Sequence, residues 1–408
     1  MLEVVSLEKA AALVAEAFGN FGGGVERIAL ENACGRVIAR DVIAEEGVPP
    51  FDRTTVDGFA VCAADTFGCS DALPALLTLA GEVLMGVDPD CACEPGTCVR
   101  IPTGGQLPAG ADAVVMLEYC EEYGDSTIGV ARPVAPGDNI VFKNDDIMPG
   151  EVLIPSGTKL CAHHIGTLAS LGVIEVDVRV PMRVGIISTG DEIVDVAQTP
   201  VASQMRDVNA PMLAAAVEAC GGRAVRFPIV PDEYEALLAV VGNALELADV
   251  IIVSGGSSAG QKDNTARVLS AYGELLFHGI AVKPGKPTMC ADVGGKPVFG
   301  LPGHPVAAYF TFLELVAPLL GGGWGHREAR RSRRAVKAAL DAAVPSNHGR
   351  SEFVAVRLSS ADGVLVASPI RGKSGLISQL SCADGYFVID RNQEGLAAGS
   401  EVEIVPFE

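Results

Sequence analysis

The sequence predicts a multidomain protein of the α/β plus β class, in which a doubly wound α/β domain is accompanied by smaller β-rich domains. Between residues 181 and 320, apolar strand patterns alternate with amphipathic helical patterns. Residues 50–145 and the region after residue 335 instead show short apolar runs separated by Gly, Pro and Asp. At 408 residues the chain is long enough for about two to four domains.

The first segment, residues 1–48, is predicted to be mainly helical. Behind Ser6, which suits an N-cap, apolar residues recur at helical spacing. They are Leu7, Ala10, Val14 and Phe18. A second helical pattern runs through "IALENACGRVIARDV" and is ended by Pro49 and Pro50.

Residues 49–146 are predicted to form a β-rich domain, because runs such as "ALLTLAG", "TCVRIP" and "AVVMLEY" are bounded by turn residues. Mixed strand and helix patterns return in residues 147–180. Segments with similar strand and helix patterns therefore flank both ends of the β-rich segment. We expect residues 1–48 and 147–180 to form one elongated mixed domain that carries the β-rich domain as an insertion.

Residues 181–326 are predicted to form the doubly wound α/β domain. The strands "RVGIIS", "AVRFPIV" and "VIIVS" alternate with the helices "APMLAAAVEAC", "DEYEALLAVVGNALELA" and "NTARVLSAY". Uniformly apolar strands with helical crossovers predict a parallel sheet covered on both faces. The apolar run 306–320 is too short to span a membrane and carries Glu314, so we interpret it as a buried helix.

Residues 327–408 are predicted to form a C-terminal β-barrel-like domain, since "SEFVAVRL", "GVLVASPI", "GYFVID" and "EVEIV" are strand-like. The basic run 327–334 precedes them. It fits either a solvated linker or a nucleic-acid patch, and the linker is the commoner interpretation of so short a run.

The composition argues against several classes of partner. With 30 Lys+Arg against 51 Asp+Glu, the net charge of −21 opposes binding to nucleic acid or to an anionic membrane. The N-terminus has no basic leader, which predicts a cytoplasmic protein. Cys91, Cys93 and Cys98 lack a second C-x-x-C and a nearby histidine, so reduced thiols are favoured over a zinc site.

Three loops of the α/β domain are candidates for chemistry. "STGDE" follows the strand that ends at Ser188, "SGGSSAGQKD" begins at Ser254, and "VKPGKPT" carries Lys283 and Lys286. Ligands of open α/β sheets bind at the carboxyl ends of the strands, where such loops meet. Each loop alone could be a tight turn or a helix cap, and "LPGHP" could be a helix entry in which His304 is a surface group.

The residue types in these loops predict a magnesium-dependent reaction on a phosphorylated ligand. Lysines beside glycine-bounded turns suit an oxyanion, and loop carboxylates suit Mg²⁺. The sequence shows no G-x-S-x-G nucleophile motif in a strand–turn–helix context and no dinucleotide-binding G-x-G-x-x-G after a strand.

Eight segments, taken in order, resemble the MoeA/gephyrin family, the molybdopterin molybdenumtransferases. They are "PPFDRTTVDGFAV", "RIPTGGQLPAGADAVVMLE", "GDNIVFKNDDIMPGEVLIPSGTKL", "RVGIISTGDEIV", "DVNAPML", "SGGSSAGQKD", "VKPGKPT" and "VFGLPGHPVAAYFTFLELVAPLL". The resemblance covers nearly the whole chain. Their joint order and spacing are far more specific than any one of them.

The resemblance implies an enzyme that inserts molybdate into adenylylated molybdopterin with Mg²⁺, releasing AMP and forming molybdenum cofactor. It implies that the α/β domain binds molybdopterin and that the elongated domain supports a homodimer. The active cleft would then lie between the α/β and C-terminal domains of one subunit and the inserted domain of the other. Alternatives are a molybdopterin adenylyltransferase and a non-catalytic molybdopterin-binding scaffold or sensor.

The resemblance also assigns residues to roles. Catalytic positions are Asp57, Thr103, Asp146, Glu192 and Asp263. The expected Mg²⁺ ligands are Asp191, Glu192 and Asp263. Positions that bind the molybdopterin substrate or molybdate are Ser188, Thr189, Gly190, Gly255, Gly256, Ser258, Lys283, Lys286, Pro302, Gly303, Arg350 and Ser374. Within this last set, Lys283 and Lys286 are expected to hold molybdate with help from Ser258, Arg350 and Ser374.

Several positions depart from the family pattern. Gln261 and Lys262 stand in place of acidic and aromatic residues, and His304 stands where Asn is typical. "FDRTT" and "NDD" replace segments that usually contain Asn-Ser and Gly-Glu-Asp. These departures are compatible with an altered anion preference, such as tungstate, or with a paralogue of lower activity.

Overall fold

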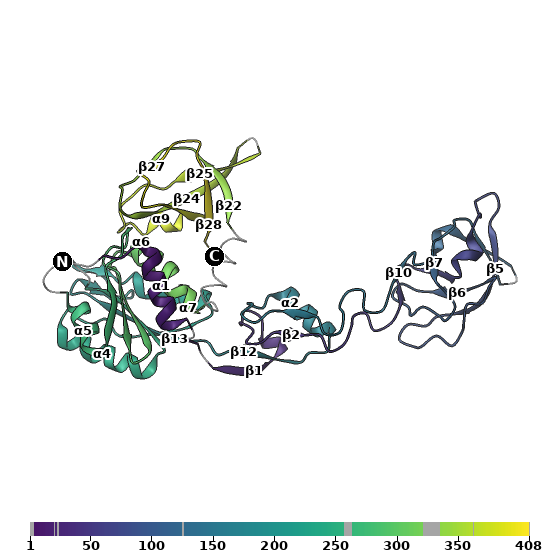
Figure 1. The fold of residues 1–408 in the computed structure, drawn as a ribbon, viewed down its shortest axis with the longest axis horizontal. Coiled ribbons are helices and arrows are strands. Elements are labelled where there is room, and N and C mark those ends of the chain that lie inside the picture. The colour runs from purple at the N-terminus through teal and green to yellow at the C-terminus, as the bar shows by residue number, and fades with distance from the viewer. Residues whose placement is uncertain are drawn as a thin grey trace.

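The computed structural model describes residues 4–19, 21–22, 24–124, 126–256, 263–320, 335–361 and 363–407. Figure 1 shows an extended molecule, with an α/β unit and a C-terminal barrel at one end and an inserted sheet at the other. Ser258, Gln261, Lys262 and the basic run 327–334 lie outside the described residues. None of the described helices is both long and apolar enough to cross a membrane.

Helix α1, Leu7–Phe18, begins where the sequence predicts, and the Ser6 hydroxyl accepts a hydrogen bond from the Lys9 amide at 3.2 Å. Its buried residues Ala10, Val14 and Phe18 belong to the core of the α/β unit. The helix therefore packs against the α/β unit, although it precedes the elongated segment in sequence (Figure 1).

The second predicted helix, in "IALENACGRVIARDV", is wrong. The chain instead forms strand β1, Val25–Ala29, a 3₁₀ turn over Leu30–Asn32, and strand β2, Val42–Ile43. β1 pairs antiparallel with β12, Glu175–Arg179, and β2 pairs with β11, Val152–Ile154. Strand partners more than 100 residues away decide this segment, because tertiary pairing overrides a local helical periodicity. Helix α2, Ala162–Ser170, completes this elongated segment.

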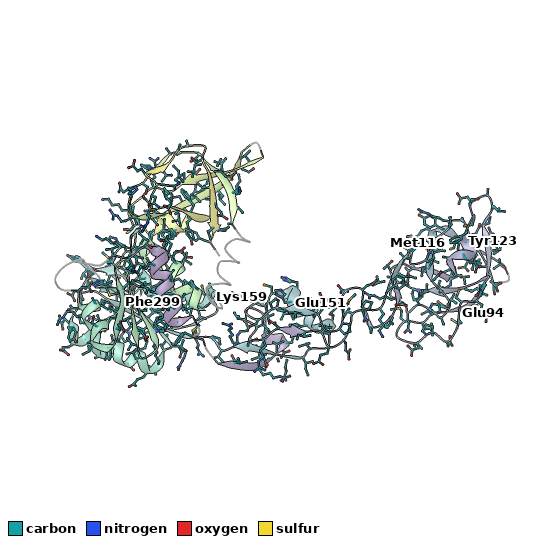
Figure 2. All side chains as sticks on the ribbon, in the orientation of Figure 1. Glu94, Met116, Tyr123, Glu151, Lys159 and Phe299 are labelled. Carbon is teal, nitrogen blue, oxygen red and sulfur yellow. The ribbon has the colours of Figure 1, made fainter. Side chains whose placement is uncertain are left out.

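The inserted region forms a six-stranded sheet in the order β7-β4-β6-β5-β9-β8, which confirms its β-rich class. The strands are β4 Gly58–Val61, β5 Ala75–Glu82, β6 Thr97–Ile101, β7 Ala113–Met116, β8 Cys120–Tyr123 and β9 Thr127–Val130. Two short strands, β3 Arg53–Thr54 and β10 Ile140–Val141, pair beside it. Figure 2 shows Met116 and Tyr123 at this end of the molecule, far from Phe299 in the α/β unit.

The α/β unit contains a six-stranded sheet in the order β16-β13-β17-β21-β20-β18. Its strands are β13 Arg183–Thr189, β16 Arg223–Arg226, β17 Val250–Gly255, β18 Glu274–His278, β20 Met289–Val293 and β21 Lys296–Leu301. β16, β13, β17 and β21 are parallel, but β20 is antiparallel to both of its neighbours. The expectation of a purely parallel sheet is therefore corrected: the two-residue Gly294-Gly295 connection, with φ of 59° and 84°, turns β20 back into β21 as a hairpin.

Helices cover both faces of this sheet, as a doubly wound fold requires. Helix α3, Asn209–Ala219, lies on the same face as α1 and the helical segment from α6, Pro305–Thr311, through a π-helical turn, Phe312–Val316, to α7, Ala317–Leu320. Helices α4, Tyr234–Leu247, and α5, Asn264–Tyr272, cover the other face. The buried helix expected over residues 306–320 is thus confirmed.

The C-terminal unit is a closed five-stranded barrel, because β24 pairs with both β25 and β26 and the ring continues through β22 and β28. Its elements are β22 Val336–Leu340, β24 Ser351–Ala361, β25 Val364–Pro369, α9 Ser378–Ser381, β26 Gly385–Ile389 and β28 Glu401–Pro406. The short strands β23 Val344–Pro345 and β27 Gly395–Leu396 pair beside it. Strand β19, Val282–Lys283, joins the α/β unit to the barrel by pairing with β24.

Candidate functional site

A cavity of about 760 Å³ opens at the carboxyl ends of the central strands of the α/β sheet. The connection after β13 leads through α3 to β16 on one side, whereas the connection after β17 leads through α5 to β18 on the other. The crevice between β13 and β17 is therefore the topological switch point of the sheet. Open α/β sheets bind their ligands at such points.

The floor of this cavity is polar and uncharged. Ser188 of β13 lies directly opposite Ser254 of β17 in the strand register. Asn209, the first residue of α3, donates from Nδ2 to Ser254 Oγ at 2.8 Å and to the Gly303 carbonyl oxygen at 2.8 Å. All three side chains belong to residues less than a tenth exposed, yet Ser188 Oγ and Asn209 Oδ1 have no hydrogen-bond partner among the described residues.

Gly255 allows the two strand ends to lie this close together. Its φ is 109°, in the region that favours glycine, and a Cβ at this position would overlap the Thr189 carbonyl oxygen. Gly303 approaches from the third side, since a Cβ there would lie 3.6 Å from the Gly255 Cα. Gly255 thus serves close backbone approach, whereas a Cβ at Gly303 would make only an ordinary contact.

The rim of the cavity is acidic. Asp191, Glu192 and Asp232 line it, Asp207 is a fourth lining carboxylate that is buried, and Arg206 is the single lysine or arginine among the described lining residues. Asp191 Oδ1 accepts from the Asp232 amide at 3.2 Å, and Asp207 Oδ1 accepts from the Ala210 amide at the start of α3 at 3.0 Å. The excess of carboxylates makes the rim suitable for a cation, or for an anion that arrives with one.

The cavity is closed on one side by a loop of the C-terminal barrel. His304 Nδ1 lies 2.8 Å from Ser374 Oγ, and the Val306 amide donates to the Ser374 carbonyl oxygen at 3.2 Å. His304 directly precedes α6 and Pro305 is its first residue, so the helix-entry interpretation of "LPGHP" is correct. The same residues also line the cavity, and they hold Ser374 at its edge.

Most of the residues expected to bind the substrate, and two of the three expected Mg²⁺ ligands, meet at this cavity. Those that line it are Ser188, Thr189, Gly190, Asp191, Glu192, Gly255, Gly256, Pro302, Gly303 and Ser374. They come from four separate stretches of sequence and are brought together by the parallel strands and the barrel loop. Ser258 lies outside the described residues.

The basic residues expected to hold molybdate lie beside the cavity instead of in its lining. Pro284, Gly285 and Pro287 line it, but Lys283 and Lys286 do not. Lys283 Nζ forms an ion pair with Glu352 Oε1 at 2.8 Å, and the pairing of β19 with the start of β24 brings this loop next to Arg350. Lys286 and Arg350 are exposed, so both side chains are accessible at the seam between the α/β unit and the barrel.

Asp263 has a structural role that the sequence analysis did not predict. Its Oδ1 accepts from the Ala266 amide at 3.0 Å and caps α5, while its Oδ2 lies 3.4 Å from His278 Nε2. Within the described ranges, no group of three or more His, Cys, Asp or Glu side chains is arranged to hold a metal ion. Of the expected set, Asp191 and Glu192 line the cavity, whereas Asp263 is not among its lining residues.

Asp57, Thr103 and Asp146 belong to the inserted sheet and its return, at the opposite end of the molecule from the cavity (Figure 1). The Thr103 amide and hydroxyl donate to Asp57 Oδ1 at 2.7 and 2.9 Å. Both hydrogen bonds lower the pKa of Asp57 below its usual value, and the bond from the backbone amide contributes more than the bond from the hydroxyl. All three residues are exposed.

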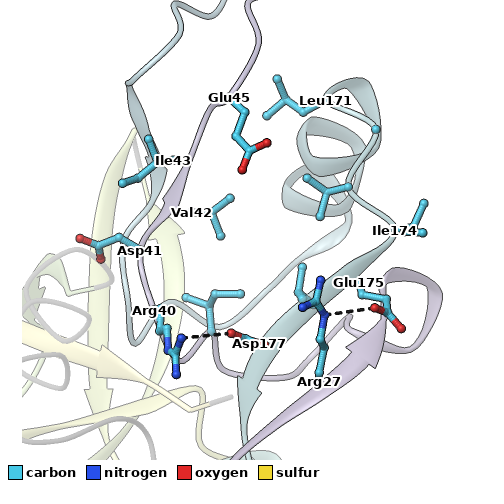
Figure 3. Close-up of a pocket in the computed structure, with 14 residues that line it drawn as sticks. Arg27, Arg40, Asp41, Val42, Ile43, Glu45, Leu171, Ile174, Glu175 and Asp177 are labelled. Carbon is cyan, nitrogen blue, oxygen red and sulfur yellow. Dashed lines mark ion pairs between the residues drawn. The ribbon is translucent and has the colours of Figure 1, made fainter.

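Two other polar features of the described residues are a second cavity and the cysteine thiols. A cavity of about 450 Å³ in the elongated segment is lined by ion pairs of Arg27 with Glu175 at 3.1 Å and of Arg40 with Asp177 at 3.7 Å (Figure 3). The cysteines of the described residues are free thiols, and burial raises the pKa of Cys98 to about 12.

The comparisons with known proteins agree with this architecture. The model of the MoeA N-terminal region (domain I and II) matches residues 5–172, a probable molybdopterin-binding domain matches residues 185–322, and the MoeA C-terminal region (domain IV) matches residues 337–407. A putative molybdopterin biosynthesis protein of Methanocaldococcus jannaschii is 32% identical over 93% of this chain and 92% of its own length. The chain belongs to the MoeA family.

Other members of the MoeA family extend the likeness. The molybdopterin molybdenumtransferase of Bacillus subtilis is 32% identical and is matched over 94% of this chain and 90% of its own length. The crystal structure of a molybdopterin biosynthesis MoeA protein from Pyrococcus horikoshii OT3 superimposes with a TM-score of 0.84 at 30% identity, covering 99% of this chain and 100% of that one. The multidomain fold expected from the sequence is therefore confirmed as that of the MoeA family.

The sequence analysis missed several residues of the family's molybdopterin-binding domain that the cavity uses. Asn209, Ser254, Asp207 and Asp232 all line it. Ser254 had a signal, since it ends the strand "VIIVS" as Ser188 ends "RVGIIS". Asn209 lies in the quoted segment "DVNAPML", but its function depends on contacts with Ser254 and Gly303 that a sequence does not reveal.

Proposed function

We propose that this protein is a molybdopterin molybdenumtransferase, which inserts molybdate into adenylylated molybdopterin and releases AMP. The observation that carries the proposal is the cavity of about 760 Å³ at the switch point, which combines a neutral polar floor with an acidic rim and opens beside the basic seam. Such a space suits a substrate that joins two ring systems through an anionic pyrophosphate. Relatives named molybdopterin molybdenumtransferase support it.

In this proposal the basic seam holds molybdate. Lys286 and Arg350 supply exposed cationic groups beside the cavity, and Ser374 supplies a hydroxyl at its edge. Lys283 is paired with Glu352, so it fixes β19 against the barrel and contributes less free charge. A small dianion needs such convergent donors, since the net charge of −21 otherwise repels it.

Magnesium fits the acidic rim. Asp191 and Glu192 offer exposed carboxylate oxygens, the ligand type that Mg²⁺ prefers, and an anionic pyrophosphate would meet four carboxylates without a cation between them. A bound Mg²⁺ would neutralise charge on the pyrophosphate and polarise its phosphorus. We assign Asp263 to positioning, because its carboxylate caps α5 and contacts His278.

The catalytic residues of the inserted sheet are proposed to act on the cavity of a second subunit in a cytoplasmic homodimer. Asp57, Thr103 and Asp146 lie at the other end of the chain from the cavity of their own subunit (Figure 1). A two-fold dimer would allow the extended arm of one copy to reach the other. The proposed domains are residues 1–48 with 147–180, 49–146, 181–326 and 327–408, with helix α1 of the first segment packed on the α/β unit.

The direct test mixes the purified protein with adenylylated molybdopterin, Mg²⁺ and either molybdate or tungstate, and measures AMP release. We expect release that requires one of these anions and is abolished by a chelator. Glu192→Gln is expected to lower the rate by at least about tenfold at fixed Mg²⁺, because one charged oxygen ligand is lost. Lys9→Ala, an exposed change on α1, should leave the rate unchanged.

The other candidate functions give different results in the same assay. Tight substrate binding with no AMP release under either anion would contradict the enzyme proposal and favour a scaffold or sensor. Formation of adenylylated molybdopterin from molybdopterin and ATP would favour an adenylyltransferase.

A mixing experiment tests the shared site. Asp57→Ala and Glu192→Gln are each expected to be nearly inactive alone, but equal amounts mixed under exchanging conditions should regain roughly a quarter of wild-type activity. The recovery arises because half of the dimers are mixed, and each mixed dimer has one intact site. Absence of recovery, with subunit exchange verified by mass spectrometry, would contradict a site shared between subunits.

A further inference from the structure

The uncharged floor of the cavity has hydrogen-bonding capacity that the protein leaves unused. Ser188 Oγ and Asn209 Oδ1 are buried, line the cavity and have no partner among the described residues. Native proteins rarely leave buried polar atoms unpaired, because each loses its hydrogen bonds to water on burial. Two such atoms at one switch point indicate groups that are completed by a ligand.

The geometry determines which of these groups donate and which accept. Asn209 Nδ2 lies 2.8 Å from the Gly303 carbonyl oxygen, which can only accept, so the amide orientation is settled and Oδ1 remains an acceptor. Ser254 Oγ accepts from the same Nδ2, which leaves its own hydroxyl proton to donate. Ser188 can do either. The floor therefore presents one acceptor, Asn209 Oδ1, and one donor, the Ser254 hydroxyl. The Ser188 hydroxyl can serve as a second donor or a second acceptor.

This arrangement does not suit an oxyanion. A molybdate or a fully ionised phosphate offers only acceptor atoms, which the fixed Asn209 Oδ1 would repel. The floor contains no cationic side chain to compensate. Arg206, the single lysine or arginine among the described lining residues, is exposed, and Lys286 and Arg350 lie outside the lining. A ligand that satisfies the floor must carry both an N–H or O–H donor and an acceptor within a few ångströms.

We infer that Asn209, Ser188 and Ser254 bind the N–H-bearing edge of a nitrogen heterocycle, and that the oxyanions of the substrate stay at the rim and the seam. The inference rests on the proposed function, whose substrate carries two such edges: the amino-pyrimidinone of the pterin and the amino-pyrimidine of adenine. It assigns Asn209 and Ser254 as specificity-determining residues. It also orients the substrate, with one ring system at the strand ends and the pyrophosphate toward Asp191 and Glu192.

The test compares Ser188→Ala with a matched control, Thr265→Val. Both remove a buried hydroxyl that has no partner among the described residues, but Ser188 lines the cavity and Thr265 does not. Binding of 6-carboxypterin, AMP, ribose 5-phosphate and inorganic pyrophosphate is measured by calorimetry on the full chain. We expect Ser188→Ala to weaken either 6-carboxypterin or AMP about tenfold, and to leave ribose 5-phosphate and pyrophosphate unchanged. Thr265→Val should leave all four unchanged.

The affected probe identifies the ring: loss of 6-carboxypterin binding assigns the pterin to the floor, and loss of AMP binding assigns adenine. A second variant, Asn209→Ala, should weaken the same probe, provided that its circular dichroism spectrum matches the wild type. The inference would be overturned if Ser188→Ala weakened the binding of pyrophosphate and left both 6-carboxypterin and AMP unchanged. It would also be overturned if Ser188→Ala changed the binding of none of the probes.

Failure of the floor assignment and failure of the proposed function give different results. AMP release by wild-type protein together with unchanged probe binding by Ser188→Ala would leave the enzyme proposal standing and overturn the floor assignment. Conversely, weakened ring binding by Ser188→Ala in a protein that releases no AMP would keep the floor assignment and contradict the enzyme proposal.

Discussion

At the floor of the cavity, Ser188, Ser254 and Asn209 are buried and uncharged; the strand register holds the two serines, and hydrogen bonds to Ser254 and Gly303 hold Asn209. Glu192 at the rim and Lys286 at the seam are instead exposed and charged. The two regions depend on different physics. Hydrogen-bond geometry at the floor is fixed by backbone packing and is insensitive to salt. The exposed charges act through a screened field with a range of about 10 Å at 0.1 M salt.

This difference separates recognition from charge handling. A buried neutral floor discriminates by leaving a wrong ligand with unpaired polar atoms, which is a strong form of selectivity. Exposed charges attract any anion or cation of suitable sign. This difference predicts that changes at the floor alter ligand binding to the same extent at every salt concentration, while the effect of removing an exposed charge becomes smaller as the salt concentration rises.

The largest effect is expected from Gly255→Ala, which alters the backbone that builds the floor. The new Cβ would overlap the Thr189 carbonyl oxygen, and the φ of 109° is unfavourable for alanine. We expect the free energy of unfolding to fall by about 3 kcal/mol or more, with loss of ring binding at every salt concentration. Urea unfolding monitored by circular dichroism measures the first quantity, and calorimetry with 6-carboxypterin and AMP measures the second.

Gly294→Ala is the matched control for this change. Gly294 also has a positive φ, 59°, but a Cβ there would meet nothing within 4 Å. Its effect on unfolding should be limited to the backbone strain of roughly 1 kcal/mol. Equal destabilisation by the two variants would show that the close approach of the strand ends contributes nothing to the stability of the floor.

An intermediate effect is expected from Lys286→Ala at the seam. Removing this exposed ammonium group should raise the molybdate concentration for half-maximal AMP release about tenfold at low salt, and less at high salt. Binding of 6-carboxypterin and AMP should stay unchanged, because the floor is not altered. Lys9→Ala removes the same charge on α1 and serves as the control. Equal losses of molybdate dependence and ring binding would contradict the separation of seam and floor.

The sequence predicted the elements of the α/β unit well because most of its strands and helices are decided locally. α3, α4 and α5 follow from helical periodicity, and the loops at the strand ends follow from the topology of parallel sheets. β1 could not be predicted in this way, since its partner β12 lies about 150 residues further along the chain. The β20–β21 hairpin had a local signal in Gly294-Gly295, which the expectation of a parallel sheet ignored.

The candidate site was predictable only in part for a related reason. Residues in the strand-end loops, such as Ser188 and Glu192, could be chosen from position and residue type. The importance of Asn209 depends on contacts with Ser254 and Gly303, and the pairing of Lys283 with Glu352 depends on where the barrel docks. Asn209 is 45 residues from Ser254 and 94 residues from Gly303 in the sequence, and no local pattern encodes contacts over such separations.

The smallest effect is expected from Thr103→Val, which removes one of the two hydrogen bonds that hold the exposed carboxylate of Asp57. The Thr103 amide and then its hydroxyl lower the pKa of Asp57, so their stabilising effect is present above the unfolded pKa and is lost as the pH falls through the folded pKa. Thr103→Val removes the hydroxyl but keeps the larger backbone contribution. The pKa of Asp57 should therefore rise part of the way toward its ordinary value, and the acid limb of the pH–activity profile should move to higher pH.

Carboxyl-carbon NMR titration measures the pKa directly, with Thr55→Val as the control because the Thr55 hydroxyl donates to the Asn139 carbonyl oxygen instead. An unchanged Asp57 pKa in Thr103→Val would show that the hydroxyl does not stabilise the carboxylate, and a shifted pKa with an unmoved acid limb would show that ionisation of Asp57 does not limit activity.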